Sequence, residues 1–172
     1  MSLEELYGPC CAAQRSISAA EEKFIPQSLQ VFDSSTAPFL KAYMDTVTGL
    51  RLPGVLHSYC AILWLINQDG QTLFALEEVV DEETGEPLSI NIRGSRSKVE
   101  GAVKLGHPSL LGEVKDARIG GEIVYNFDES RWEINNFSGR YGTRPHQTLS
   151  HLQAAADVFK VEGIQLEPVF SA

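Results

Sequence analysis

Three polar segments in the second half of the chain contain the residues best suited to chemistry. They are Arg93–Ser97, Leu105–Ser109 and Ser138–Tyr141, and each follows or connects predicted strands. If these strand ends meet at one edge of a sheet, the polar side chains share one cleft. The candidate members of that cleft are Arg93, Arg96, His107, Ser109, Glu122, Arg140 and Tyr141.

Five of these residues are candidates for binding a ligand. Arginine binds carboxylates and phosphates through two parallel hydrogen bonds, so Arg93, Arg96 and Arg140 point to an anionic or phosphate-bearing ligand. Ser109 and Tyr141 add hydroxyl groups to the same predicted rim. No nearby acidic residues in the sequence obviously neutralise all three arginines, and this makes them candidates for binding an anion.

The remaining two residues are candidates for catalysis. His107 could exchange protons near neutral pH, and Glu122 could orient or deprotonate a reacting group. Together with Arg93 and Ser109 they would form the site of a small transferase-like enzyme, for example one acting on a nicotinamide dinucleotide. NAD is expected only under this hypothesis, and no other cofactor is predicted.

A structural interpretation of the same residues stays open. Ser-Gly and Gly-His-Pro are common turn sequences. In this interpretation Tyr141 covers a sheet edge with its hydroxyl in water, and Glu122 is an exposed carboxylate on a strand. The sequence contains no Gly-x-Ser-x-Gly elbow, phosphate-binding loop or dinucleotide fingerprint. His146 and His151 are five residues apart, and the three cysteines lack metal-ligand spacing, so no metal site is predicted.

The charge of the chain is concentrated in its first half. Of the net −9, residues 1–90 carry all nine, with 4 Lys/Arg against 13 Asp/Glu, and residues 91–172 balance at 10 against 10. This acidity argues against nucleic acid as a partner, because phosphate binding needs a basic face. The carboxylates between Glu77 and Glu86 predict either a solvated hairpin tip or a surface that docks a basic protein. The candidate partner-binding residues are Glu78, Asp81, Glu82 and Glu83.

Hydrophobic patterning predicts a single α+β domain. Phe39, Leu40, Tyr43, Met44 and Val47 fall on one face of a helix over 36–48. We expect residues 1–50 to be mainly helical or irregular, 55–136 to be rich in strands, 147–161 to form a helix and 164–169 a short strand. Strands are expected over 55–66, 72–80, 88–92, 120–127 and 131–136. The expected architecture is a mainly antiparallel sheet with an N-terminal helical region and a C-terminal helix packed on it.

The expected location is the cytoplasm. The longest apolar run, 61–66, is far shorter than the roughly 20 residues of a membrane-spanning helix. The first five residues lack the basic and apolar regions of a signal peptide. Three free thiols fit a reducing compartment.

Residues from about 96 to 166 resemble a module at the C-terminal side of plant IQ-motif-containing calmodulin-binding proteins, which also occurs in bacterial polymorphic-toxin-like proteins. Its His-Ser-Ser block corresponds to His107–Leu111, with Pro108 in place of Ser. Its Ala-Gly-Glu block corresponds to Gly120–Glu122, and its Ser-Gly-His-Tyr block to Ser138–Tyr141, with arginine in place of histidine. The resemblance implies a strand, loop, strand, turn and helix order. No IQ motif is present, so calmodulin does not carry over as a partner.

Two hypotheses of function follow. The first is an acidic protein-binding module, of the immunity or effector-associated type found beside bacterial toxins, which binds a basic partner. The toxin context comes from the resemblance alone. The second is the small effector-like enzyme described above.

Overall fold

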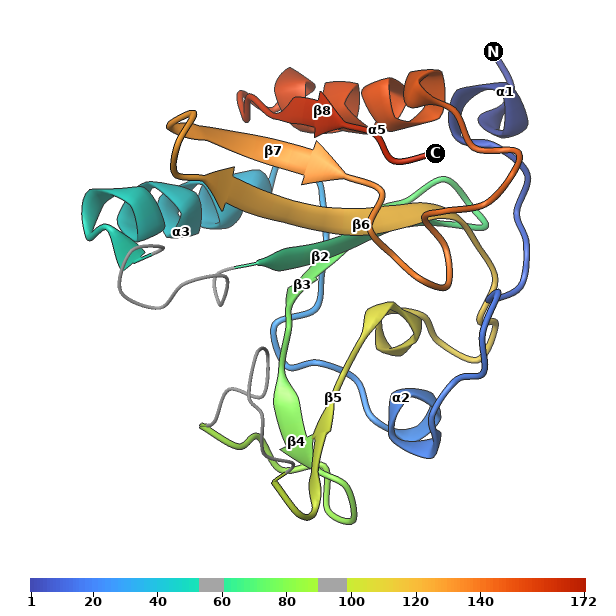
Figure 1. The fold of residues 1–172 in the computed structure, drawn as a ribbon, viewed down its shortest axis with the longest axis vertical. Helices are drawn as coiled ribbons and strands as arrows, with labels where there is room; N and C mark the ends of the chain where they lie inside the picture. The colour runs from blue at the N-terminus through green and yellow to red at the C-terminus, as the bar shows by residue number, and fades with distance from the viewer. Residues whose placement is uncertain (53–60, 90–98) are drawn as a thin grey trace.

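The computed structural model describes residues 1–52, 61–89 and 99–172 and confirms the α+β fold. Its centre is a six-stranded sheet in the order β1-β3-β2-β6-β7-β8, antiparallel except for the parallel pair β7 and β8 (Figure 1). The strands are β1 (Gln30–Val31), β2 (Ile62–Asn67), β3 (Thr72–Leu76), β6 (Ala117–Asn126), β7 (Arg131–Asn135) and β8 (Glu167–Val169). A second sheet pairs β4 (Val79–Asp81) with β5 (Ala102–Lys104).

Within the described residues, four α-helices and one 3-10 turn are assigned beside the sheets. They are α1 (Leu3–Tyr7), α2 (Ala19–Lys23), α3 (Ala37–Gly49), α5 (Leu149–Val161) and the 3-10 turn η2 (His107–Leu110). In Figure 1, α5 runs along the β7–β8 end of the main sheet with α1 beside it, and the β4–β5 pair projects from the other end. Within the described ranges, no helix has the length and apolar character needed to cross a bilayer.

Strand β2 lies in the middle of the sheet because it is apolar on both faces. It pairs with β3 on one side and β6 on the other. Ile62, Trp64 and Ile66 face one core, and Leu63 and Leu65 face the other, all almost completely buried. A continuous apolar run is typical of a strand buried on both sides, so the predicted central strand is confirmed. Its predicted first residues, 55–60, lie outside the described residues.

The two long helices cover one face of the sheet. Leu40 and Met44 of α3 and Leu152 and Phe159 of α5 join one cluster around Trp64. The helix expected over 36–48 is confirmed, except that Phe39 does not belong to its buried face and is 74% exposed. The apolar period placed Phe39 correctly on the helix, but its side chain lines an open groove instead of the packed core.

The opposite face is covered by short segments. Leu110 of η2, Tyr141 and the chain around Ala13 and Leu29 pack on Leu63 and the other residues of this second core. Most of this covering chain is turn and loop, so its main-chain groups need partners other than a helix or a sheet.

The strand expected over 72–80 is divided in two. Strand β3 ends at Leu76 and β4 begins at Val79, after which the chain leaves the main sheet to pair with β5. At the break, the Glu78 carboxylate accepts hydrogen bonds from the main-chain N–H groups of Gln27 and Ser28. The alternation of residue types gave no sign of this change of partner. The strand predicted over 88–92 falls mostly outside the described residues.

Glycine allows β6 and β7 to cross closely where β7 ends. A Cβ atom on Gly121 would lie 1.8 Å from the carbonyl oxygen of Asn135. The close approach of the two backbones therefore explains why position 121 is a glycine.

Candidate functional site

The residues predicted to form a cleft do converge, but in a packed region around η2. His107, Ser109, Arg140 and Tyr141 lie on the second face of the sheet, where η2 meets β6 and the turn after β7. Glu122 of β6 is half-buried and close enough to act electrostatically on His107. The two other predicted ligand-binding residues, Arg93 and Arg96, lie outside the described residues.

His107 is held by the main chain of the sheet. Its side chain is buried, and Nε2 lies 2.7 Å from the Gly121 carbonyl oxygen, so this nitrogen donates the hydrogen bond. Burial lowers the pKa of His107, and the Gly121 carbonyl and the Glu122 carboxylate oppose that shift only partly. A general base has to reach its substrate. His107 instead has only 7% of its surface exposed to solvent.

The two predicted ligand-binding hydroxyls also point inward. Ser109 is fully buried and donates its hydroxyl to the Gly106 carbonyl at 2.6 Å, which closes the η2 turn. Tyr141 is fully buried and donates to the Lys115 carbonyl at 2.8 Å. Burial raises the pKa of Tyr141 to about 12. The interpretation of Tyr141 as an edge residue with its hydroxyl in water is therefore wrong.

Arg140 has a partner that the sequence analysis missed. Its guanidinium forms an ion pair with Glu21 at 3.0 Å and donates to the Ser16 carbonyl. The Glu21 side chain is only 4% exposed, and it also accepts hydrogen bonds from Ser18 and from the Gly106 main-chain N–H. The Ser-x-x-Glu spacing at 18–21 is a capping-box signal that could have identified the start of α2. It gives no indication of Arg140, which is 119 residues further along the chain.

Two further cations bind main-chain carbonyls in this region. Lys115 donates to three carbonyl oxygens, those of Glu21 in α2 at 3.1 Å, Pro108 in η2 at 3.0 Å and Leu111 at 2.8 Å. Arg144 is buried and donates to the carbonyls of Cys11, Ala12 and Ala117 at 2.6 to 2.8 Å. Desolvation lowers the pKa of both Lys115 and Arg144. These contacts hold the loops of the second face against the sheet.

The predicted partner-binding carboxylates have different roles. Glu78 binds the segment before β1, and Asp81 accepts hydrogen bonds from the main-chain N–H groups of the turn that follows it. Those N–H groups lower the pKa of Asp81. Glu82 and Glu83 are exposed on that turn. The acidic segment is therefore a structured turn that leaves part of its charge accessible.

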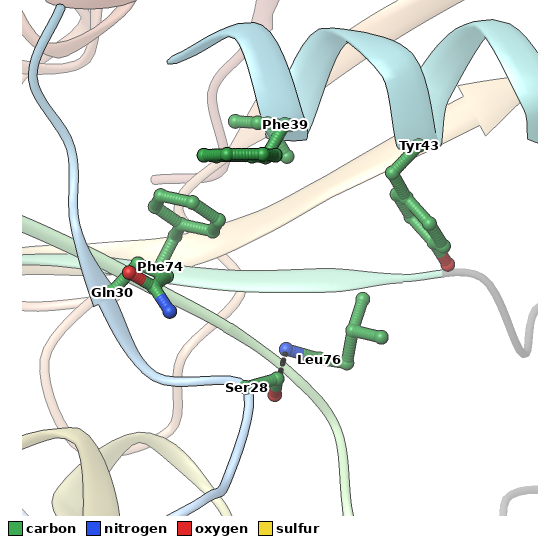
Figure 2. A pocket seen from close by; sticks show the side chains of 7 residues that line it. Ser28, Gln30, Phe39, Tyr43, Phe74 and Leu76 are labelled. Atoms are coloured by element: carbon green, nitrogen blue, oxygen red, sulfur yellow. Dashed lines mark hydrogen bonds between the residues drawn. The ribbon is translucent and has the colours of Figure 1, made fainter. Parts of the chain in front are cut away.

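An open apolar groove lies on the other face, between α3 and the edge of the sheet (Figure 2). Its volume is about 400 Å³, and it is lined by Ser28, Gln30, Phe39, Leu40, Tyr43, Phe74 and Leu76. Figure 2 shows the ring of Phe39 over that of Phe74 at one end, with Ser28 and Leu76 at the other. Three aromatic side chains and a few polar groups in an open concavity are typical of a binding site.

The strand edge beside this groove offers little for strand addition. Strand β1 has only two residues, and the outward carbonyl of Val31 accepts a hydrogen bond from the Thr36 hydroxyl at 2.6 Å. A very short edge strand resists pairing with another chain. A molecule in the groove would therefore be bound mainly through its side chains.

The described residues contain no group of three or more His, Cys, Asp or Glu side chains arranged to hold a metal ion. His146 and His151 both approach Gly8, where a Cβ atom would lie 3.4 Å and 3.5 Å from their rings. His151 caps the first turn of α5 by accepting a hydrogen bond from the Thr148 N–H.

No family model, curated protein or solved structure matches the chain. Function therefore has to be argued from two features of the molecule. The network around η2 is buried and held by many internal hydrogen bonds, whereas the groove beside α3 is open and apolar.

Proposed function

We propose that this chain is an acidic protein-binding module that holds a basic partner, of the immunity or effector-associated type. The observation that carries the proposal is the aromatic groove between α3 and the sheet edge, with Phe39 exposed at its rim (Figure 2). The bacterial toxin context rests on the resemblance of residues 96–166 to polymorphic-toxin-like proteins.

Exposed aromatic rings around a concavity favour recognition of another protein. A bulky side chain inserted between Phe39 and Phe74 would remove apolar surface of both rings from water. Aromatic side chains in pockets are the usual anchors of protein interfaces. In the isolated chain Phe39 contributes little hydrophobic stabilisation, because 74% of its surface stays in contact with solvent.

The sign of the charge favours a basic partner. The chain carries a net charge of −9, and Glu82 and Glu83 are exposed on the turn after β4. Such charge mainly increases the rate of association with a partner of opposite sign and suppresses binding of acidic proteins.

The alternative of a small transferase stays a prediction. Its proposed cleft combines Arg93, His107, Ser109 and Glu122, of which His107 and Ser109 are buried and bonded to the main chain. A substrate would reach them only after the packing around η2 opened, so the described geometry gives more support to a binding function.

A peptide-display experiment tests the proposed function. A random 12-residue peptide library is selected on the wild-type chain, on Phe39→Ser and on the control Phe127→Ser, which changes another exposed phenylalanine in the β6–β7 turn. We expect the wild type and the control to enrich the same peptides, and Phe39→Ser to bind them at least about tenfold more weakly. Absence of enrichment, or equal binding by all three proteins, would overturn the proposal.

A further inference from the structure

We propose that the groove selects a partner segment in which a bulky apolar residue stands beside a lysine or arginine, with the cation set against Glu78. This inference rests on the proposed function and specifies the chemistry of the partner. The apolar residue would lie between Phe39 and Phe74, and the cation would lie at the Ser28 end of the groove.

Glu78 is a half-buried carboxylate whose hydrogen-bond donors are all neutral. It accepts from the Gln27 N–H at 2.9 Å, from the Ser28 N–H at 2.8 Å and from the Ser28 hydroxyl. Its neighbour Glu77, by contrast, forms an ion pair with Lys104 at 3.1 Å. Among the described residues no cation pairs with Glu78, so its negative charge remains available to a cation from outside.

Ser28 connects this charge to the groove. Its hydroxyl accepts from the Leu76 N–H at 2.9 Å and donates to Glu78, and both Ser28 and Leu76 line the groove. Figure 2 shows this polar end apart from the rings of Phe39 and Phe74. The groove therefore has an apolar end and a polar end at Ser28, and the Glu78 carboxylate lies one hydrogen bond beyond that polar end. This arrangement fits a segment with one apolar side chain and one long cationic side chain.

Other occupants fit this arrangement less well. An extended strand added to the sheet would need the outward carbonyl of Val31, which Thr36 already occupies. A second copy of the chain would bring another nine negative charges towards the same acidic region. An acidic peptide would place a carboxylate beside Glu78. The charge and the blocked edge together favour a cationic segment bound through its side chains.

Two restricted peptide libraries separate this inference from the proposed function. Both are nine residues long with a central Phe, Leu or Trp, and the neighbouring positions are Lys or Arg in one library and Asp or Glu in the other. We expect only the basic library to be enriched in a manner that depends on Phe39. Equal Phe39-dependent enrichment of both libraries would overturn the inference and leave the proposed function standing. Absence of any Phe39-dependent enrichment would overturn both.

A pair of charge variants then tests Glu78 directly. Glu78→Gln keeps one oxygen, which can still accept the hydrogen bonds of Ser28, and loses the second oxygen, which accepts from the Gln27 N–H. Glu113→Gln removes the same charge at an exposed position away from the groove. We expect Glu78→Gln to weaken a basic-library peptide about threefold to fivefold and to reduce the salt dependence of its binding, with Glu113→Gln close to wild type. Equal effects of the two variants would refute a specific role for Glu78. Thermal unfolding of both variants confirms that each is folded.

Discussion

The buried histidine of the second face makes the stability of the chain depend on pH in a defined direction. Burial lowers the pKa of His107 in the folded protein below its ordinary value, so the unfolded chain takes up a proton first as the pH falls. The contribution of a neutral His107 to stability is therefore complete above about pH 6.5 and is lost as the pH falls from there towards the lower folded pKa. His146 and His151, whose pKa values burial also lowers, act in the same direction.

The size of the effect follows from proton linkage. The most that one histidine can cost between pH 7.5 and pH 5.5 is about 1.4 kcal/mol of stability, the limit reached when the folded protein takes up no proton on it; one pKa unit corresponds to about 1.36 kcal/mol. Replacing His107 by Gln also removes or alters the 2.7 Å hydrogen bond to Gly121. That loss should lower stability by about 1 to 3 kcal/mol at every pH.

Urea unfolding of the wild type, His107→Gln and His151→Gln at pH 7.5, 6.5 and 5.5 measures both quantities. The unfolding free energy of the wild type should decrease between pH 7.5 and pH 5.5. We expect this decrease to be about 1 kcal/mol smaller in His107→Gln. The difference should be less in His151→Gln, because the His151 ring is only partly buried. An unchanged pH dependence in His107→Gln would mean that the ring is protonated as easily in the folded chain as in the unfolded one. Such a result would contradict a buried structural role and favour the catalytic hypothesis for His107.

Three further predictions concern the second face. Glu21→Gln should lower the unfolding free energy by about 2 kcal/mol, and its combination with Arg140→Gln should cost less than the sum of the single changes; strict additivity would contradict the ion pair. Gly121→Ala should lose at least about 3 kcal/mol, since its Cβ would meet a carbonyl oxygen, while Gly112→Ala, with open space around it, should unfold like the wild type. Absorbance titration at 295 nm should leave Tyr141 neutral at pH 11, because its pKa is raised to about 12; a smaller absorbance rise at pH 11 in Tyr141→Phe would refute this.

Regular periodicity made most of the fold predictable from the sequence. The buried run of β2, the β6–β7 hairpin and the amphipathic pattern of α5 all follow from residue types a few positions apart. The same reasoning could not divide 72–80 into β3 and β4, because the break depends on a contact between Glu78 and a segment about 50 residues earlier. It also gave no indication of α1, which has five residues and no buried side chain.

The candidate site shows the same limit more strongly. Sequence reasoning correctly grouped His107, Ser109, Arg140 and Tyr141, since the strands and turns that carry them are local features. Whether such side chains face a cleft or the protein interior depends on distant partners. Glu21 neutralises Arg140 across 119 residues, and no pattern in the sequence connects the two.

The abundance of polar residues in the second half of the chain has a structural cause on the second face of the sheet. In the part of the chain that the structure describes, this face is covered mainly by turns and loops, whose buried carbonyl groups lack helical or sheet partners. Arg118 donates to carbonyls of Gln68 and Gly8. Arg144 and Lys115 each bind three main-chain carbonyls in the same way. Long cationic side chains can satisfy several acceptors at once, so arginine and lysine accumulate here without a ligand. The face covered by α3 is packed by helices, and it is there that the open apolar groove lies, to which we assign the proposed partner.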